Sequence, residues 1–106
     1  MAEDTTPEIS VHEAQRRIQE GALLLDVREQ NEFDELRIPG AQLLPLSELT
    51  ARVDDLPKDR PIVAQCRSGK RSAKATDFLR EQGFDAVNME GGILAWRDEG
   101  LPVEEG

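Results

Sequence analysis

Short apolar runs alternate with segments of helical composition along this chain of 106 residues. The clearest unit is 62–72, where three apolar residues typical of a buried strand lead into a glycine-containing turn and then a helix. The other strands are expected at 8–10, 23–28, 41–44 and 84–89, and the helices at 11–20, 32–36, 45–53, 72–80 and 93–99. This alternation predicts a three-layer α/β/α domain with a mainly parallel sheet of four or five strands. A functional site is then expected at the carboxyl ends of the strands.

The length and composition fit one globular domain. Residues 1–7 are polar and are expected to form a flexible N-terminus, so that 8–106 would be the domain. One cysteine allows no internal disulfide and, without a histidine cluster, no zinc site, and we expect no cofactor. No apolar run is long enough to span a membrane, and no signal peptide is apparent. These features favour a cytoplasmic, reducing setting.

Charge is distributed unevenly along the chain. Acidic residues outnumber basic ones by 22 to 13. Between residues 60 and 76, however, there are five bases and no acid, which leaves about −14 on the remaining segments. The net charge of −9 argues against partners such as nucleic acid or anionic membranes. The basic segment instead predicts a local binding site for a small anion.

Cys66 lies at the centre of this basic segment, directly after the predicted strand. The N-terminus of the following helix would direct backbone N–H groups and a positive dipole end toward the loop. A cysteine in such surroundings has a lowered pKa and is a good nucleophile. The alternative is that Cys66 is a small buried apolar residue, but a position beside a run of bases argues against it. We therefore interpret Cys66 as a nucleophile in an anion-binding loop.

Four other polar or aromatic positions allow more ordinary interpretations. Asp26 and Arg28 follow a buried strand and are interpreted as a structural ion pair that fixes the next loop. His12, the only histidine, is assigned a surface or packing role. Trp96 is expected to anchor the last helix in the core.

Four sequence motifs follow one another along the chain. They are Leu-Asp-Val-Arg at 25–28 followed by Glu32 and Phe33, Ile-Pro-Gly-Ala at 38–41, Cys-Arg-Ser-Gly-Lys-Arg-Ser at 66–72, and Asn-Met-Glu-Gly-Gly-Ile at 88–93 with Trp96. In these motifs the chain resembles the single-domain rhodaneses, which are sulfurtransferases. Arg37 stands where the family commonly has histidine, which we interpret as a surface variation. The resemblance implies a rhodanese-like α/β/α domain.

The resemblance also implies a mechanism. Cys66 would take the outer sulfur of an anionic donor such as thiosulfate as a persulfide and pass it to cyanide or a thiol. Backbone N–H groups of the loop would stabilise the persulfide, while its basic side chains bind the donor. The predicted substrate-binding residues are Arg67, Ser68, Gly69, Lys70, Arg71 and Ser72. Arg71 could instead hold the loop's shape, and the two serine hydroxyls could bind sulfur or act as ordinary turn and cap residues.

Three alternatives remain at this point. A cysteine-dependent phosphatase is disfavoured because only four residues separate Cys66 from Arg71, where the related phosphatases have five. A non-catalytic binding module is disfavoured because the cysteine and its basic neighbours are all present. A persulfide relay would carry sulfur from a protein donor, such as a cysteine desulfurase, to a sulfur-carrier protein or biosynthetic enzyme. The sequence does not separate this relay from small-molecule turnover.

Overall fold

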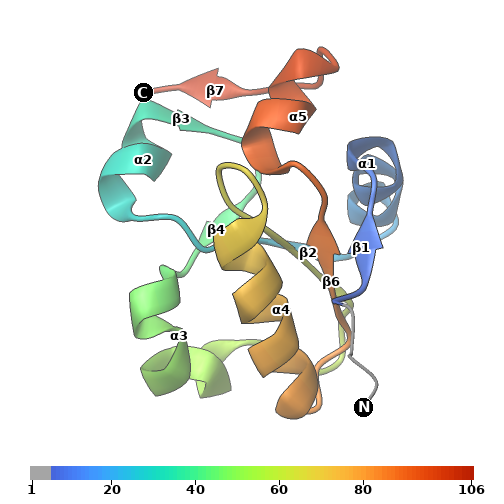
Figure 1. The fold of residues 1–106 in the computed structure, drawn as a ribbon, viewed down its shortest axis with the longest axis vertical. Helices are drawn as coiled ribbons and strands as arrows, with labels where there is room; N and C mark the ends of the chain where they lie inside the picture. Colours follow the sequence, from blue (N-terminus) through green and yellow to red (C-terminus); the bar gives the residue numbers. More distant parts are fainter. Residues whose placement is uncertain (1–5) are drawn as a thin grey trace.

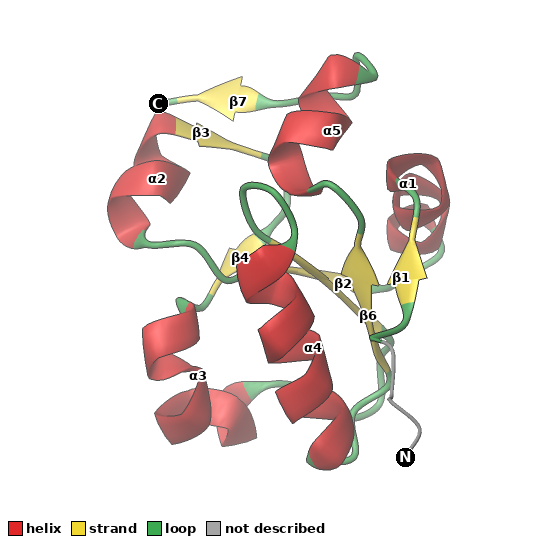
Figure 2. Ribbon diagram, viewed as in Figure 1, coloured by secondary structure: helices red, strands yellow, loops and turns green. Residues whose placement is uncertain are grey.

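The computed structural model describes residues 6–106, which form a central sheet covered by helices on both faces (Figures 1 and 2). The elements in chain order are β1 (Glu8–Ile9), α1 (Val11–Gln19), β2 (Leu23–Asp26), α2 (Gln30–Glu35), β3 (Leu36–Arg37), β4 (Gln42–Leu43), α3 (Leu46–Arg52), the 3₁₀ turn η1 (Val53–Asp55), β5 (Ile62–Gln65), α4 (Lys70–Glu81), β6 (Ala86–Met89), α5 (Gly92–Asp98) and β7 (Glu104–Glu105). The expected three-layer α/β/α fold is confirmed.

The main sheet has five parallel strands in the order β1-β6-β5-β2-β4. The central strand β5 pairs with both β2 and β6, so the strand that precedes Cys66 is surrounded by neighbours. All parallel strands end at one edge of the sheet. The structure therefore places the carboxyl ends of β2, β5 and β6 beside one another, as a ligand site in this kind of fold requires.

Both faces of the sheet are buried, which explains why its central strands are apolar throughout. Leu23 and Leu25 of β2 belong to a core cluster with residues of α3 and α4. Leu24, on the opposite face, belongs to a second cluster with residues of α1 and α5. Trp96 of α5 lies in this second cluster, 4% exposed, and its Nε1–H donates to the carbonyl of Pro102 at 2.7 Å. Its predicted role as a core anchor is confirmed.

A buried ion pair fixes the loop that leaves β2. Arg28 and Asp26 are almost fully enclosed, and the guanidinium donates to the carboxylate from Nη2 at 2.8 Å and from Nε at 3.0 Å. The same guanidinium donates to the carbonyl of Leu36 at 2.6 Å, beyond α2. The predicted structural pair is thus confirmed, and it also holds the far end of α2 against the sheet.

The bounds predicted for the short elements around α2 were wrong. We expected Asn31 to precede a helix that included Leu36, but the helix runs from Gln30 to Glu35. The backbone N–H of Glu29 caps the helix start by donating to the carboxylate of Glu32 at 3.0 Å. Leu36 belongs instead to β3, which pairs antiparallel with β7 near the C-terminus. Two-residue strands without an apolar run leave no sequence pattern to detect.

The N-terminal segment was expected to be flexible over residues 1–7, and 1–5 lie outside the described residues. Thr6 Oγ1 donates to Asp77 at 2.8 Å, and the carbonyl of Pro7 accepts from Asn88 N–H at 2.9 Å. His12 is exposed and contacts Glu99 at 2.8 Å, which agrees with a surface role. Within residues 6–106, no helix has the length and apolar character needed to cross a bilayer.

Gln65, the last residue of β5, is fully buried and opposite Asp26 in the sheet. Neither polar atom of its side-chain amide has a hydrogen-bond partner among the residues that the structure describes. A buried amide without partners costs free energy, because it has lost its hydrogen bonds to water.

Replacing this amide by a thioether of similar shape should stabilise the fold. We expect Gln65→Met to raise the free energy of unfolding by about 1–2 kcal/mol, measured by urea denaturation. The matched control Gln19→Met changes an exposed residue at the end of α1 and should stay within about 0.5 kcal/mol of the parent. A loss of stability in Gln65→Met would show that the amide has a partner.

Candidate active site

The loop between β5 and α4 forms a tight coil above the first turn of α4 (Figure 1). Cys66 follows the strand directly and is 1% exposed. Gly69, whose φ of 104° disfavours any residue with a side chain, turns the chain into the helix. Lys70, Arg71 and Ser72 then make up the first turn of α4. The structure thus gathers the seven predicted site residues, 66–72, at the carboxyl end of the central strand.

The sulfur of Cys66 is surrounded by hydrogen-bond donors. The backbone N–H of Gly69 lies 3.1 Å from Sγ, and the N–H of Ser72 lies 3.4 Å from it. The hydroxyl of Ser72 is also 3.4 Å from Sγ. Ser68 differs from Ser72, since its side chain is exposed and only its backbone N–H helps to lower the pKa of Cys66. Such donors stabilise negative charge on sulfur without any adjacent cation.

These donors set the acidity of the nucleophile. Burial is the largest single influence on Cys66 and raises the pKa of its thiol. The Ser72 hydroxyl and the N–H groups of Ser72, Gly69 and Ser68 act in the opposite direction, and together they leave the pKa below its ordinary value. The thiolate, which is the reactive form, is therefore more accessible at Cys66 than at an ordinary cysteine.

Asn88 of β6 organises the loop from beneath, and the sequence did not single it out as a site residue. It is fully buried, and its Oδ1 accepts from the Ser72 hydroxyl at 2.5 Å. Its Nδ2 donates to the carbonyl of Gly69 at 3.1 Å and to Glu8 of β1 at 3.0 Å. A hydroxyl has one proton, so Asn88 and Sγ are alternative acceptors for Ser72. The sequence did contain one signal for this role. Asn88 is an amide within a predicted strand, and a buried amide requires hydrogen-bond partners.

The first turn of α5 holds the other side of the loop. The N–H of Ile93 donates to the carbonyl of Cys66 at 2.8 Å, and the N–H of Leu94 donates to the carbonyl of Arg67 at 3.2 Å. Gly92 has a φ of 62°, and a Cβ there would overlap both carbonyl oxygens. The glycine therefore permits a backbone approach that no larger residue could make. This explains physically why a Gly-Gly pair follows β6.

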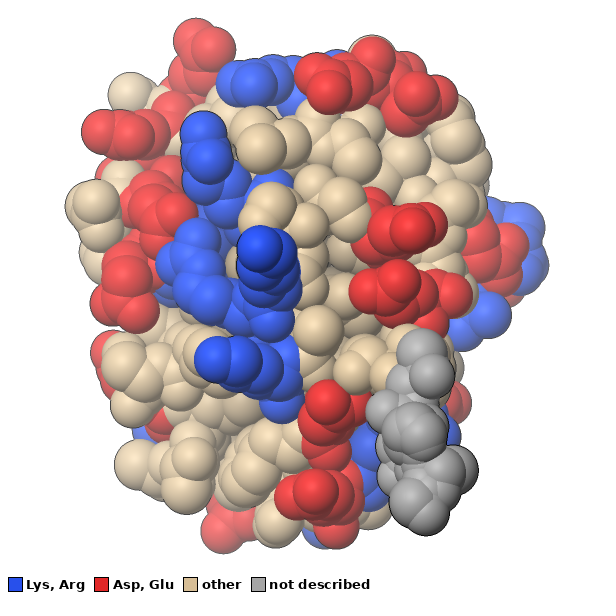
Figure 3. Space-filling model, viewed as in Figure 1, with Lys and Arg blue, Asp and Glu red and all other residues tan. Residues whose placement is uncertain are grey.

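The basic side chains around the loop have two different environments. Arg71 donates to both carboxylate oxygens of Glu32 at 2.8 and 2.9 Å, and this hydrogen-bonded pair lowers the pKa of Glu32 to about 2. Arg67 and Lys70 are exposed and form no ion pair with a described residue. Figure 3 shows basic side chains gathered in a band over the loop and α4, with acidic side chains on both sides. The unpaired cations are thus available to an incoming anion.

The fold and the site can now be compared with known proteins. The family described as Rhodanese-like domain matches residues 10–99. A protein named sulfurtransferase from Allochromatium vinosum is 44% identical over 85 residues, 79% of each chain. The thiosulfate sulfurtransferase GlpE of Actinobacillus pleuropneumoniae is 34% identical over 95% of both chains. A solved structure of a rhodanese-related protein from Thermoplasma volcanium has a TM-score of 0.88 and 35% identity, and covers 92% of this chain and 97% of its own.

The chain therefore belongs to the rhodanese-like domain family, and its activity is that of a sulfurtransferase. The resemblance indicated by the four sequence motifs is confirmed over nearly the whole chain. Arg37, the departure from the family pattern, lies in β3, where its guanidinium contacts Glu104 of β7 at 3.3 Å and the ring of Phe33 at 5.6 Å. It thus helps to attach the C-terminal segment.

The two serines of the loop should respond differently to removal of the hydroxyl. Ser72→Ala removes a donor that stabilises the thiolate, so the pKa of Cys66 should rise. The midpoint of the pH profile for alkylation by iodoacetamide should move to higher pH, with several-fold less thiolate at neutral pH. Ser68→Ala keeps the backbone N–H and should leave the midpoint unchanged. Equal midpoints in all three proteins would exclude this role for the Ser72 hydroxyl.

Gly92 and Gly83 provide a matched test of the contact between α5 and the loop. Both have positive φ, but a Cβ at Gly83 meets nothing within 4 Å. Gly83→Ala should cost about 1–2 kcal/mol of unfolding free energy through backbone strain alone. Gly92→Ala adds the overlap with two carbonyls and should cost about 3 kcal/mol or more, with loss of sulfur transfer. Equal losses in urea denaturation would contradict the proposed close approach.

Proposed function

We propose that this protein moves sulfane sulfur from a small anionic donor such as thiosulfate to a thiophilic acceptor through a persulfide on Cys66. The observation that carries the proposal is the set of N–H and O–H donors from Gly69 and Ser72 around Sγ. Those groups can stabilise charge on a thiolate and, after transfer, on the persulfide. The name of the related GlpE, a thiosulfate sulfurtransferase, supports thiosulfate as the donor.

The proposed reaction has two steps. The Cys66 thiolate attacks the outer sulfur of thiosulfate, the S–S bond of the donor breaks, and sulfite leaves with the electron pair. The acceptor, cyanide or a thiolate, then attacks the outer sulfur of the persulfide. The Cys66–sulfur bond breaks, its electron pair returns to Cys66 as thiolate, and thiocyanate or an acceptor persulfide is released. The nucleophile is regenerated without a cofactor.

The charged residues divide into two roles under this proposal. Arg67 and Lys70 are exposed and unpaired among residues 6–106, and they attract and orient the donor dianion. Arg71 acts through its two hydrogen bonds to Glu32, which tie the first turn of α4 to α2. It thereby fixes the loop rather than the substrate. Gly69 allows the turn, and Ser68 and Ser72 supply donors to sulfur.

The same geometry disfavours a phosphatase. A cysteine-dependent phosphatase needs the loop arginine to face the phosphoryl group, whereas Arg71 is bound to Glu32. The donors of the loop converge on one sulfur atom, and only four residues lie between Cys66 and Arg71. A relay to a protein acceptor uses the same persulfide, and the exposed basic band over α4 is a surface that a macromolecule could reach.

Intact-protein mass spectrometry tests the proposal directly. Incubation with thiosulfate should add the mass of one sulfur atom, and cyanide should then remove it and yield thiocyanate. Cys66→Ser should lose all transfer, because a hydroxyl is a far weaker nucleophile at neutral pH. Unchanged urea denaturation of Cys66→Ser would show that the loss is chemical. Sulfur loading of Cys66→Ser, or no loading of the parent protein by thiosulfate, would contradict the proposed reaction.

A further inference from the structure

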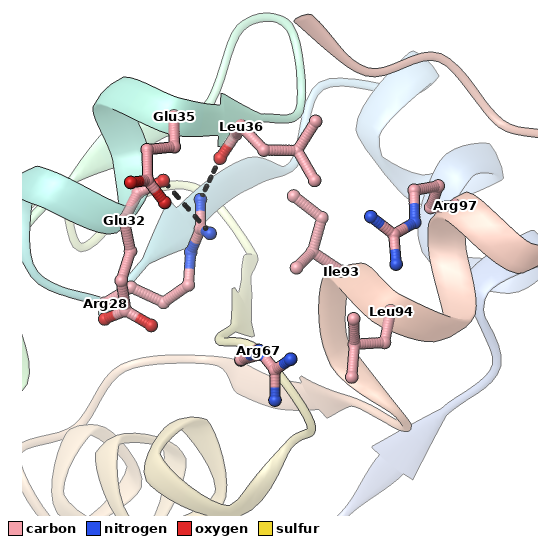
Figure 4. Close-up of a pocket in the computed structure, with 8 residues that line it drawn as sticks. All are labelled: Arg28, Glu32, Glu35, Leu36, Arg67, Ile93, Leu94 and Arg97. Carbon is pink, nitrogen blue, oxygen red and sulfur yellow. Dashed lines mark hydrogen bonds between the residues drawn. The ribbon is translucent and has the colours of Figure 1, made fainter. Parts of the chain in front are cut away.

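A cleft of about 150 Å³ lies beside the Cys66 loop, between α2 and β3 on one side and α5 on the other (Figure 4). Part of its wall is apolar and is formed by Leu36, Ile93 and Leu94. Arg67 and Arg97 also line it, and Figure 4 shows their guanidinium groups on either side of Leu94. The cleft therefore combines an aliphatic surface with two basic groups.

Arg67 and Arg97 differ from the third arginine of the cleft, because Arg28 is paired with Asp26. On the α2 side, the carboxylate of Glu32 is paired with Arg71, whereas Glu35 is an exposed carboxylate that also lines the cleft. Arg67 and Arg97 are exposed, and neither forms a hydrogen bond or ion pair through its side chain within the described part of the chain. Both guanidinium groups therefore keep their donors free for an anion.

The cleft is connected to the nucleophile through the backbone. Ile93 lines the cleft, and its N–H donates to the carbonyl of Cys66 at 2.8 Å. Arg67 follows Cys66 directly in the chain and accepts from the N–H of Leu94. A molecule held by these residues would lie against the segment that fixes the position of the sulfur.

An inorganic donor does not use the apolar wall. Thiosulfate has no carbon, and the cations of the loop suffice for its charge. A volume of about 150 Å³ has room for a small organic molecule. A short carbon chain can pack on Leu36, Ile93 and Leu94 while a carboxylate binds arginine, the anion that its planar group matches best. The cleft therefore fits the organic acceptor rather than the donor.

We propose that the cleft lined by Arg67 and Arg97 selects sulfur acceptors in which a carboxylate and a thiol are joined by a short aliphatic chain, with Arg97 as the residue that recognises the carboxylate. This inference rests on the persulfide reaction proposed above. The acceptor thiolate attacks the outer sulfur, the bond from that sulfur to Cys66 breaks, and Cys66 regains its thiolate. The acceptor leaves as a persulfide with its carboxylate unchanged.

The test isolates the acceptor step. The protein is first loaded with thiosulfate, and the persulfide is verified by mass. Its decay in a single turnover is then measured with 3-mercaptopropionate and with 3-mercaptopropionamide, which differ only in charge. Rates are compared at equal thiolate concentration. The parent protein should react about tenfold faster with the carboxylate, the factor expected of one charge-assisted hydrogen-bonded contact.

Variants of Arg97 assign the preference to this side chain. Arg97→Gln should slow the reaction of 3-mercaptopropionate about tenfold and leave that of the amide unchanged. Arg97→Lys, which keeps the charge, should retain part of the preference, and Arg97→Glu should favour the cationic thiol cysteamine. The matched control Lys74→Gln removes one exposed positive charge from α4, outside the cleft, and should not change the ratio of the two rates.

The outcomes distinguish a failure of the persulfide reaction from a failure of the acceptor site. Failure to load sulfur contradicts the persulfide reaction itself, and with it this inference. Normal loading with equal rates for the carboxylate and the amide contradicts only the acceptor site. The same holds if Arg97→Gln and Lys74→Gln lower the ratio of rates equally, because general charge attraction would then account for the preference. A loss of the ratio in Arg97→Gln alone supports the assigned site.

Discussion

The hydrogen bond from the Ile93 N–H to the Cys66 carbonyl connects the last helix to the nucleophile. It requires the backbone of α5 to approach the loop closely, and Gly92 permits that approach. The same contact places Ile93 and Leu94 in the wall of the neighbouring cleft. One backbone interaction therefore fixes both the position of the sulfur and the shape of the adjacent surface. A buried side-chain network from Asn88 supports the loop from the opposite side.

The fold and the place of Cys66 at the end of the central strand could be predicted because their signals are local. The run before Cys66 is apolar on both faces, and the glycine and bases after it mark a turn and an anion-binding helix start. The partners that complete the site could not be predicted in this way. Asn88 and Glu32 bond to residues of α4 from other elements, and Arg97 lines the neighbouring cleft. Only the tertiary structure brings them together. The β3–β7 pair was missed for a similar reason.

Two kinds of group stabilise negative charge at this site, and they lie at different distances from the sulfur. Close to the sulfur, the stabilising groups are neutral dipoles from the loop backbone and Ser72. Farther out, Arg67 and Lys70 carry full charges that face solvent. In the proposed reaction, fixed dipoles would stabilise charge on the thiolate or the persulfide without holding the leaving sulfite, whereas a cation in direct contact would bind sulfite more strongly. Arg71 is paired with Glu32, so that the carboxylate offsets part of its charge beside the site.

The near-complete enclosure of Cys66, 1% exposed, has a consequence for the oxidation chemistry of the protein. Enclosure limits the contact of the resting sulfur with dissolved oxidants and so slows its conversion to sulfenic and sulfinic acids. A persulfide extends the side chain outward by about one S–S bond, roughly 2 Å, and brings its terminal sulfur toward water. Under the proposed reaction, the persulfide is therefore more exposed to oxidants than the resting cysteine, most of all when no acceptor is present to remove its outer sulfur.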